Sequence, residues 1–163
     1  GNPLRLRRAL DAGVKVVVAH CASLGDDLDD DGKLRSSFDL FLKLMAEPRS
    51  KTLLHGDISA ITQRNRKPVL IRTLLERSDL HDRLLHGSDY PLPGIVPLTS
   101  TSALAKAGLL PKAAVNDLDI LRQHNPLLFD FALKRLLNWQ GQAFAPSVFQ
   151  TRKIFGARNG HGA

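Results

Sequence analysis

Three polar side chains close three apolar segments of the sequence: His20 after residues 14–19, Asp57 near the end of residues 52–58, and Asp89 after residues 84–87. A histidine can bind a metal ion or act as a general base, and a carboxylate can bind the same ion or carry a proton. If the three segments are neighbouring parallel strands, their carboxyl ends meet at one rim. We therefore expect the three side chains to lie close together.

Plainer interpretations of these residues stay open. Asp89 follows Gly87-Ser88, and an aspartate in such a turn often caps its own backbone. A histidine after a strand is often a hydrogen-bonded structural residue. His55 and Asp57 share one strand face, because side chains alternate along a strand. The sequence does not decide whether His55 or Asp57 faces the rim.

Two further motifs have weaker claims to chemistry. Asp27, Asp29, Asp31 and Gly32 have the spacing that opens an EF-hand calcium loop, but the twelfth position is a phenylalanine where a glutamate is needed. We interpret residues 25–32 as a solvated loop. Cys21 has small apolar neighbours, and we expect it to be a buried packing residue.

The segments that carry these residues alternate between helix and strand patterns. Residues 14–19 are apolar almost throughout, which is typical of a strand buried on both faces of a parallel sheet, and strands are also expected at 52–58 and 84–87. Helices are expected from Asn2-Pro3 to Gly13 and over 34–46, 68–75, 102–107, 111–123 and 126–137. This order predicts an α/β fold whose three strands leave two exposed sheet edges.

Composition excludes several classes of protein. The chain has 163 residues, 43% hydrophobic and 24% charged, with no apolar run near the roughly 18 residues of a membrane span. The opening segment has no pattern of a secretory signal. The formal charge is +7, but the basic residues are scattered without interleaved aromatics, which disfavours a nucleic-acid partner. The single cysteine excludes an internal disulfide and indicates a reducing, cytoplasmic location.

Three segments resemble the last three barrel strands of an amidohydrolase-related, metal-dependent hydrolase: VVVAH at 16–20, GDISA at 56–60 and LHGSDYP at 85–91. The resemblance implies the C-terminal portion of a (β/α)8 TIM barrel, which takes about 250 residues when complete. It implies about three parallel strands with flanking helices in residues 1–137, ending in a helical region. Residues 138–163 would be a C-terminal extension, partly disordered.

The resemblance also implies chemistry. Asp89 would be a metal-binding or water-activating carboxylate, and His20 a catalytic or metal-binding histidine, with a divalent ion such as zinc. Family members hydrolyse small amides, esters or lactones, or decarboxylate small acids. The family's His-x-His pair and the histidine of its fifth strand have no counterpart here. We therefore expect the parent protein to be a hydrolase and this chain to be inactive by itself.

An alternative function remains open beside the hydrolase. The chain would then be a non-catalytic half-barrel that assembles with itself or with a missing N-terminal half, or that binds a polyanion.

Overall fold

A computed structural model describes residues 1–155, and its centre is a parallel sheet of three strands in the order β1–β4–β5. The strands are β1 (Val16–Val18), β4 (Leu54–Asp57) and β5 (Leu84–Leu85). Val17 lies opposite His55, and Asp57 opposite Leu85. The predicted α/β class with three parallel strands flanked by helices is confirmed.

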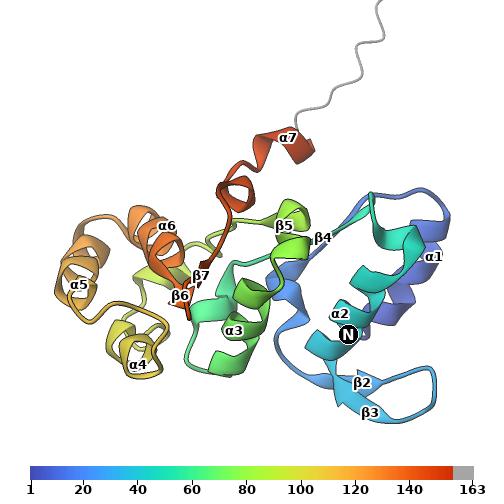
Figure 1. Cartoon of the computed structure of the whole chain (residues 1–163), viewed down its shortest axis with the longest axis horizontal. Coiled ribbons are helices and arrows are strands. Elements are labelled where there is room, and N and C mark those ends of the chain that lie inside the picture. The colour runs from blue at the N-terminus through green and yellow to red at the C-terminus, as the bar shows by residue number, and fades with distance from the viewer. Residues whose placement is uncertain (156–163) are drawn as a thin grey trace, which may run out of the picture.

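The helices gather in two groups around this sheet (Figure 1). One group contains the 3-10 turn Pro3–Leu6, α1 (Arg7–Asp11) and α2 (Ser37–Ala46), and α3 (Pro68–Glu76) lies between it and the second group. The second group contains α4 (Thr101–Lys106), α5 (Ala114–His124) and α6 (Pro126–Leu136). No helix within residues 1–155 is both long enough and apolar enough to span a membrane.

Asparagine caps begin two of these elements as the sequence predicted. The Oδ1 atom of Asn2 accepts a hydrogen bond from Leu4 N at 2.9 Å, and that of Asn125 accepts one from Leu128 N at 3.0 Å. A proline follows each asparagine at the first helical position, where its missing N–H costs nothing. Gly13 ends the first helical segment with φ of 77°, a conformation that favours glycine.

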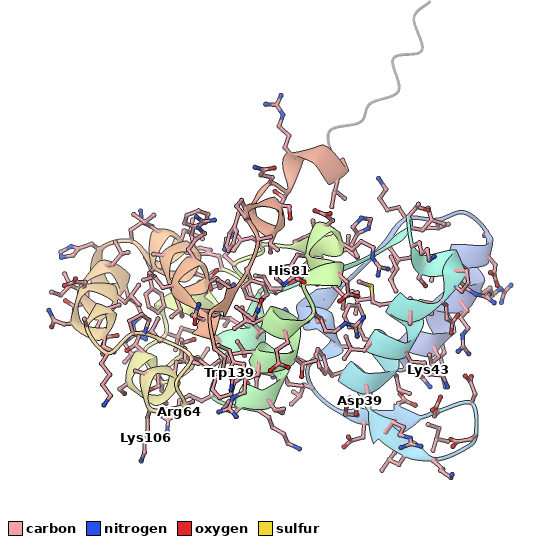
Figure 2. All side chains as sticks on the ribbon, viewed as in Figure 1. Asp39, Lys43, Arg64, His81, Lys106 and Trp139 are labelled. Atoms are coloured by element: carbon pink, nitrogen blue, oxygen red, sulfur yellow. The ribbon has the colours of Figure 1, made fainter. Side chains whose placement is uncertain are left out.

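The chain after α6 packs back onto the rest of the protein. Strands β6 (Asn138–Trp139) and β7 (Gln142–Ala143) form a hairpin, followed by the 3-10 turn Pro146–Phe149, called η7, and α7 (Arg152–Phe155). Trp139 donates a hydrogen bond to Glu76 on α3 at 3.0 Å, and buried His81 accepts one from Ala145 N at 3.1 Å (Figure 2). The predicted extension therefore packs on α3 through the β6–β7 hairpin and on β5 through η7. The disorder predicted for its end, from Arg158 onward, lies outside the described residues.

Two predicted features differ from the structure. Residues 25–32 are not a plain loop, because β2 (Asp26–Leu28) pairs antiparallel with β3 (Leu34–Ser36). The following helix consequently begins at Ser37, and Leu34 is 69% exposed. The strand β1 is not buried on both faces, since it forms the edge of the sheet and Val17 is 37% exposed.

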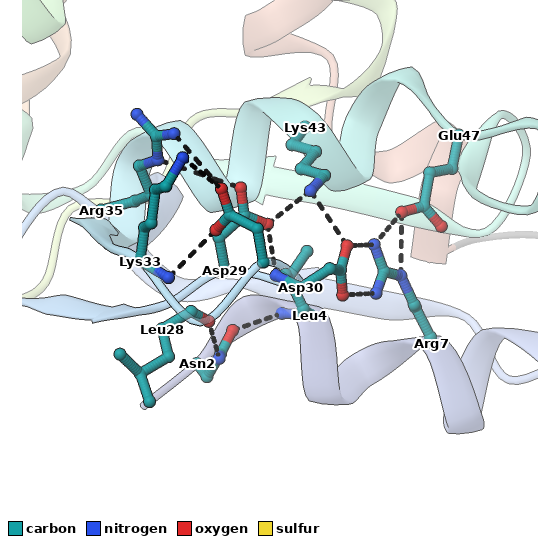
Figure 3. A network of polar contacts seen from close by, with 11 residues as sticks. Asn2, Leu4, Arg7, Leu28, Asp29, Asp30, Lys33, Arg35, Lys43 and Glu47 are labelled. Atoms are coloured by element: carbon teal, nitrogen blue, oxygen red, sulfur yellow. Dashed lines mark hydrogen bonds and ion pairs between the residues drawn. The ribbon is translucent and has the colours of Figure 1, made fainter.

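Ion pairs hold the β2–β3 hairpin against the first two helices (Figure 3). Arg7 on α1 binds Asp30 at 2.6 Å and Glu47 at 2.5 Å, and Lys43 on α2 binds Asp30 at 2.9 Å and also pairs with Asp29. These bonds raise the pKa values of Arg7 and Lys43. Backbone pairing of β2 with β3 closes the hairpin, and cations from two helices dock its acidic turn.

The core comes closest to the backbone at Gly56 on β4. A Cβ atom at this position would lie 2.6 Å from Cζ of Phe41 and 2.8 Å from Sγ of Cys21. Both neighbours are fully buried, so they have little room to move. Glycine at this position therefore lets α2 pack directly on the middle strand.

We expect Gly56→Ala to lower the free energy of unfolding by about 1–3 kcal/mol, because the added methyl overpacks a filled core. Urea unfolding followed by circular dichroism measures the change. Val69→Ala, at a position 54% exposed on α3, is the control and should change stability by at most about 0.5 kcal/mol. Equal effects of the two substitutions would contradict the close packing at Gly56.

The hairpin should loosen as the pH falls. Hydrogen bonds from Lys43 lower the pKa of Asp29, and those from Arg7 and then Lys43 lower the pKa of Asp30. Their stabilising effect is therefore present above the ordinary aspartate pKa of about 3.9 and is lost as the pH falls through the lowered values. Amide hydrogen exchange of residues 26–36 measures this effect. The protection factors, each calculated relative to an unfolded chain at the same pH, should fall as the pH is lowered.

Arg7→Met should loosen the same hairpin at pH 7. Arg8→Met, at an exposed neighbouring position of the same helix, should leave its protection unchanged. Identical exchange in the two variants would show that the ion pairs do not hold the hairpin.

Candidate functional site

The three polar side chains predicted to meet do lie at one rim of the sheet. Nδ1 of His20 is 3.8 Å from Oδ1 of Asp57, and Nε2 of His20 is 3.9 Å from Oδ2 of Asp89. Each side chain is between 23% and 32% exposed, so each remains open to solvent or to a ligand. The rim therefore joins the carboxyl ends of all three parallel strands.

Asp57, rather than His55, is the residue of β4 that reaches the rim. His55 is 6% exposed, and its Nδ1 atom has no hydrogen-bond partner within residues 1–155. Burial lowers the pKa of His55, so its ring is held neutral. The side chains of His55 and Asp57 share one face of β4. Asp57 reaches the rim because it is the last residue of the strand, whereas His55 lies two residues earlier and is buried.

The chain leaves β1 through an unusual turn. His20, Cys21 and Ala22 have φ values of 55°, 49° and 51°, a left-handed conformation that costs an ordinary residue about 1–2 kcal/mol. Oδ1 of Asp57 accepts a hydrogen bond from His20 N at 3.2 Å, and the carbonyl of Asp57 accepts one from Cys21 Sγ at 3.1 Å. Backbone strain of this kind concentrates at functional sites, where neighbouring contacts maintain it.

Ser59 connects His20 to Asp57. Asp57 Oδ1 accepts hydrogen bonds from Ser59 N at 2.8 Å and from the Ser59 hydroxyl, whose oxygen also lies 2.5 Å from His20 Nδ1. Because the single hydroxyl proton goes to Asp57, the Nδ1–H of His20 must donate to Ser59. The neutral ring then carries its lone pair on Nε2, which faces Asp89.

This arrangement makes Ser59 an orienting residue. A serine nucleophile would give its proton to a histidine, whereas this hydroxyl accepts from one. Sequence reasoning missed Ser59, although the Asp-x-Ser spacing at 57–59 is a common turn signal.

The turn at Asp89 leaves the carboxylate free for the rim. Asp89 has φ of 58°, and its carbonyl accepts a hydrogen bond from Leu92 N at 3.0 Å. Tyr90 N donates to the hydroxyl of Ser88 at 3.3 Å, and the Tyr90–Pro91 bond is cis. Ser88 thus caps this turn, while the carboxylate of Asp89 faces His20.

His20 and Asp89 can share one metal ion but do not complete its coordination. Two ligands of a tetrahedral zinc, each about 2.0–2.1 Å from the ion, lie roughly 3.3 Å apart, so the 3.9 Å between Nε2 and Oδ2 would have to shorten for both atoms to bind one ion. A catalytic zinc takes three protein ligands. Within residues 1–155, no cluster of three or more His, Cys, Asp or Glu side chains is arranged to hold an ion. These residues fit part of a zinc site, and at least one further ligand is needed.

A cavity of about 480 Å³ adjoins His20 at the carboxyl end of β1. Val18, Ala22, Leu6 and Arg66 contribute to its walls. Arg66 donates to Ser23 Oγ at 2.8 Å, and its buried Nη1 has no partner in the described part of the chain. Burial lowers the pKa of Arg66, and the nearby charge of Asp89 opposes that effect. The sequence indicated only a scattered surface base at this position.

Cys21 is packed beneath the rim and takes no part in its chemistry. The thiol is fully buried, and burial raises its pKa well above the ordinary value. A protonated, inaccessible thiol is a poor nucleophile and a poor metal ligand. The predicted packing role of Cys21 is confirmed by its burial.

Comparison of the chain with known proteins found no matching protein-family model, curated protein or solved structure.

Ser59→Ala should shift the tautomer equilibrium of the His20 ring. In the unaltered protein we expect imidazole ¹⁵N shifts of a protonated Nδ1 and an unprotonated Nε2. Without the hydroxyl, the Nε2–H form should gain population, because the carboxylate of Asp89 can accept that proton. Ser102→Ala on the exposed face of α4 is the control. A protonated Nε2 in the neutral ring of the unaltered protein would contradict the hydrogen-bond assignment.

Proposed function

We propose that this chain is the C-terminal part of a metal-dependent hydrolase related to the amidohydrolases. Its substrate would be a small amide, ester or lactone, or a small acid that it decarboxylates. The observation that supports this most is the pairing of His20 Nε2 with the Asp89 carboxylate, 3.9 Å apart, at the rim of a parallel sheet. Active sites of (β/α)8 enzymes lie at this rim. The sole cysteine is a buried thiol, as suits a cytoplasmic enzyme.

Each residue of the rim has a role in the proposed reaction. His20 and Asp89 would hold a zinc-like ion, and Asp89 would also accept a proton from water. Such an ion, when bound, polarises a carbonyl or lowers the pKa of a water molecule. Asp57 and Ser59 keep the ring of His20 in the tautomer whose lone pair faces Asp89. This orientation is needed for Nε2 to act as a ligand or a base.

Completion of the site requires further polypeptide, which we assign to a missing N-terminal half of the barrel. The free side of β1 and the cavity beside it offer a place for another strand. The outer side of β5 is partly covered, because His86 N donates to the carbonyl of Val148 in η7 at 2.8 Å. In a closed barrel this side would pair with the first strand, so the η7 contact would have to shift.

A second candidate function is assembly without catalysis. The edge strand β1 leaves Val17 37% exposed, and the preceding Val14 is 51% exposed. Unpaired edges of this kind readily pair with another chain. A stable dimer on sizing chromatography would favour a self-assembling half-barrel. Salt-sensitive binding to heparin would favour a polyanion-binding module with its charge of +7.

Zinc titration tests the proposed function on the chain as it stands, without a histidine tag. We expect weak one-to-one binding by calorimetry, together with a rise of the thermal midpoint when zinc is in excess. Asp89→Asn and His20→Ala should each weaken binding roughly tenfold or more, since each removes a ligand. Asp117→Asn and His124→Ala, at exposed positions of α5, are matched controls and should bind zinc like the unaltered chain.

Two outcomes would contradict the proposal. If His20→Ala and Asp89→Asn left the zinc affinity unchanged, these residues would not be metal ligands. Measurable hydrolysis of an ester or amide by the zinc-loaded chain alone would show that no further ligand is required. The coding sequence before Gly1 gives a separate check, because a complete barrel of this family carries an in-frame His-x-His motif on its first strand.

A further inference from the structure

A buried lysine lies directly behind the rim. Lys134 on α6 is 0% exposed. Its Nζ atom donates hydrogen bonds to the Gly87 carbonyl at 2.7 Å and to Oδ2 of Asp130 at 2.6 Å. The same oxygen of Asp130 lies 3.1 Å from Nε2 of His86. This network joins the last long helix to the strand end that leads into Asp89.

Burying the charged ammonium group of Lys134 costs more free energy than burying an apolar side chain at this position would. An apolar side chain of similar size would fill the same space without desolvating an ammonium group. Burial lowers the pKa of Lys134, and the negative charge of Asp130 opposes this effect most strongly, followed by those of Asp57 and Asp89. Two rim carboxylates therefore act electrostatically on this ammonium group.

The bond to Gly87 comes where the ladder of the sheet has ended. The last hydrogen bond between β4 and β5 runs from Ile58 N to the Leu85 carbonyl, and His86 N bonds to η7. Gly87 lies close to the site, because a Cβ atom there would be 3.4 Å from Cβ of Ser59. Two residues later, Asp89 takes its left-handed φ of 58°. Lys134 thus anchors the backbone immediately before the carboxylate.

We propose that Lys134 is a positioning residue of the rim, which holds the Gly87 carbonyl and thereby the turn that presents Asp89 to His20. Its catalytic meaning rests on the proposed function, but its effect on the turn does not. The competing role is that of a counter-ion, needed only because Asp130 is buried. The two roles differ in what happens when both charges are removed together.

A double variant separates these roles. Lys134→Met alone leaves Asp130 as an uncompensated buried carboxylate and should destabilise the protein strongly. Lys134→Met combined with Asp130→Asn removes both charges. The amide oxygen of the new asparagine can still accept a hydrogen bond from His86 Nε2. Urea unfolding measures stability. Amide hydrogen exchange of Tyr90 and Leu92, which donate to the Ser88 hydroxyl and the Asp89 carbonyl, measures the order of the turn. Lys106→Met, at an exposed position of α4, is the control.

The proposal expects the double variant to recover most of the stability lost in Lys134→Met. Its Tyr90 and Leu92 amides should still exchange at least tenfold faster than in the unaltered chain, because the Gly87 carbonyl has lost its donor and the turn is no longer anchored. The control should match the unaltered chain in both measurements. Recovery of amide protection together with stability would overturn the proposal and leave Lys134 a counter-ion.

A double variant that does not fold would also overturn it, since Lys134 would then determine the fold rather than the site. Zinc affinity of the folded double variant gives a third measurement, expected to be about tenfold weaker. Absence of zinc binding by the unaltered chain would refute the proposed function, while the amide exchange would still decide the role of Lys134.

Discussion

The carboxylate of Asp57 is the interaction on which the rim depends. One oxygen of this carboxylate accepts hydrogen bonds from the backbone of His20, the backbone of Ser59 and the hydroxyl of Ser59. It therefore compensates the left-handed turn after β1 and orients the imidazole that the turn carries. Removal of this carboxylate would leave three buried or half-buried donors without their acceptor, which costs far more than the loss of one surface contact.

Charge serves two purposes in different parts of the protein. At the surface, Arg7 and Lys43 hold an acidic hairpin through exposed ion pairs that salt and acid can weaken. In the interior, Lys134 is enclosed with Asp130 behind β5, where the surrounding protein screens the pair far less. The surface pairs shape a peripheral segment, whereas the interior pair acts on the backbone beside the candidate site.

The uneven edges of the sheet govern how the protein can work. The outer side of β5 is contacted by η7, whereas no strand within residues 1–155 pairs with the outer side of β1, whose carboxyl end borders the cavity next to His20. A site with two suitable metal ligands beside an open edge is suited to completion by additional polypeptide. The proposed hydrolase and the proposed self-assembling half-barrel both depend on this open edge.

The sequence by itself determined the features that depend on local pattern: the three strands, the helix starts at Asn2 and Asn125, and the placing of His20, Asp57 and Asp89 at strand ends. Apolar runs and asparagine–proline caps act over a few residues, so they can be recognised in one dimension. The resemblance to the amidohydrolases stays a prediction.

Only the tertiary structure decided which of these features contact partners far along the chain. Arg7 pairs with Asp30 across 23 residues and so docks the turn of a hairpin where a loop was expected, and Val17 of the edge strand β1 is 37% exposed although the strand reads as buried. Ser59 bonds to His20 across 39 residues, and Lys134 to Gly87 across 47. No local pattern encodes such contacts, because they arise only when separate elements pack together.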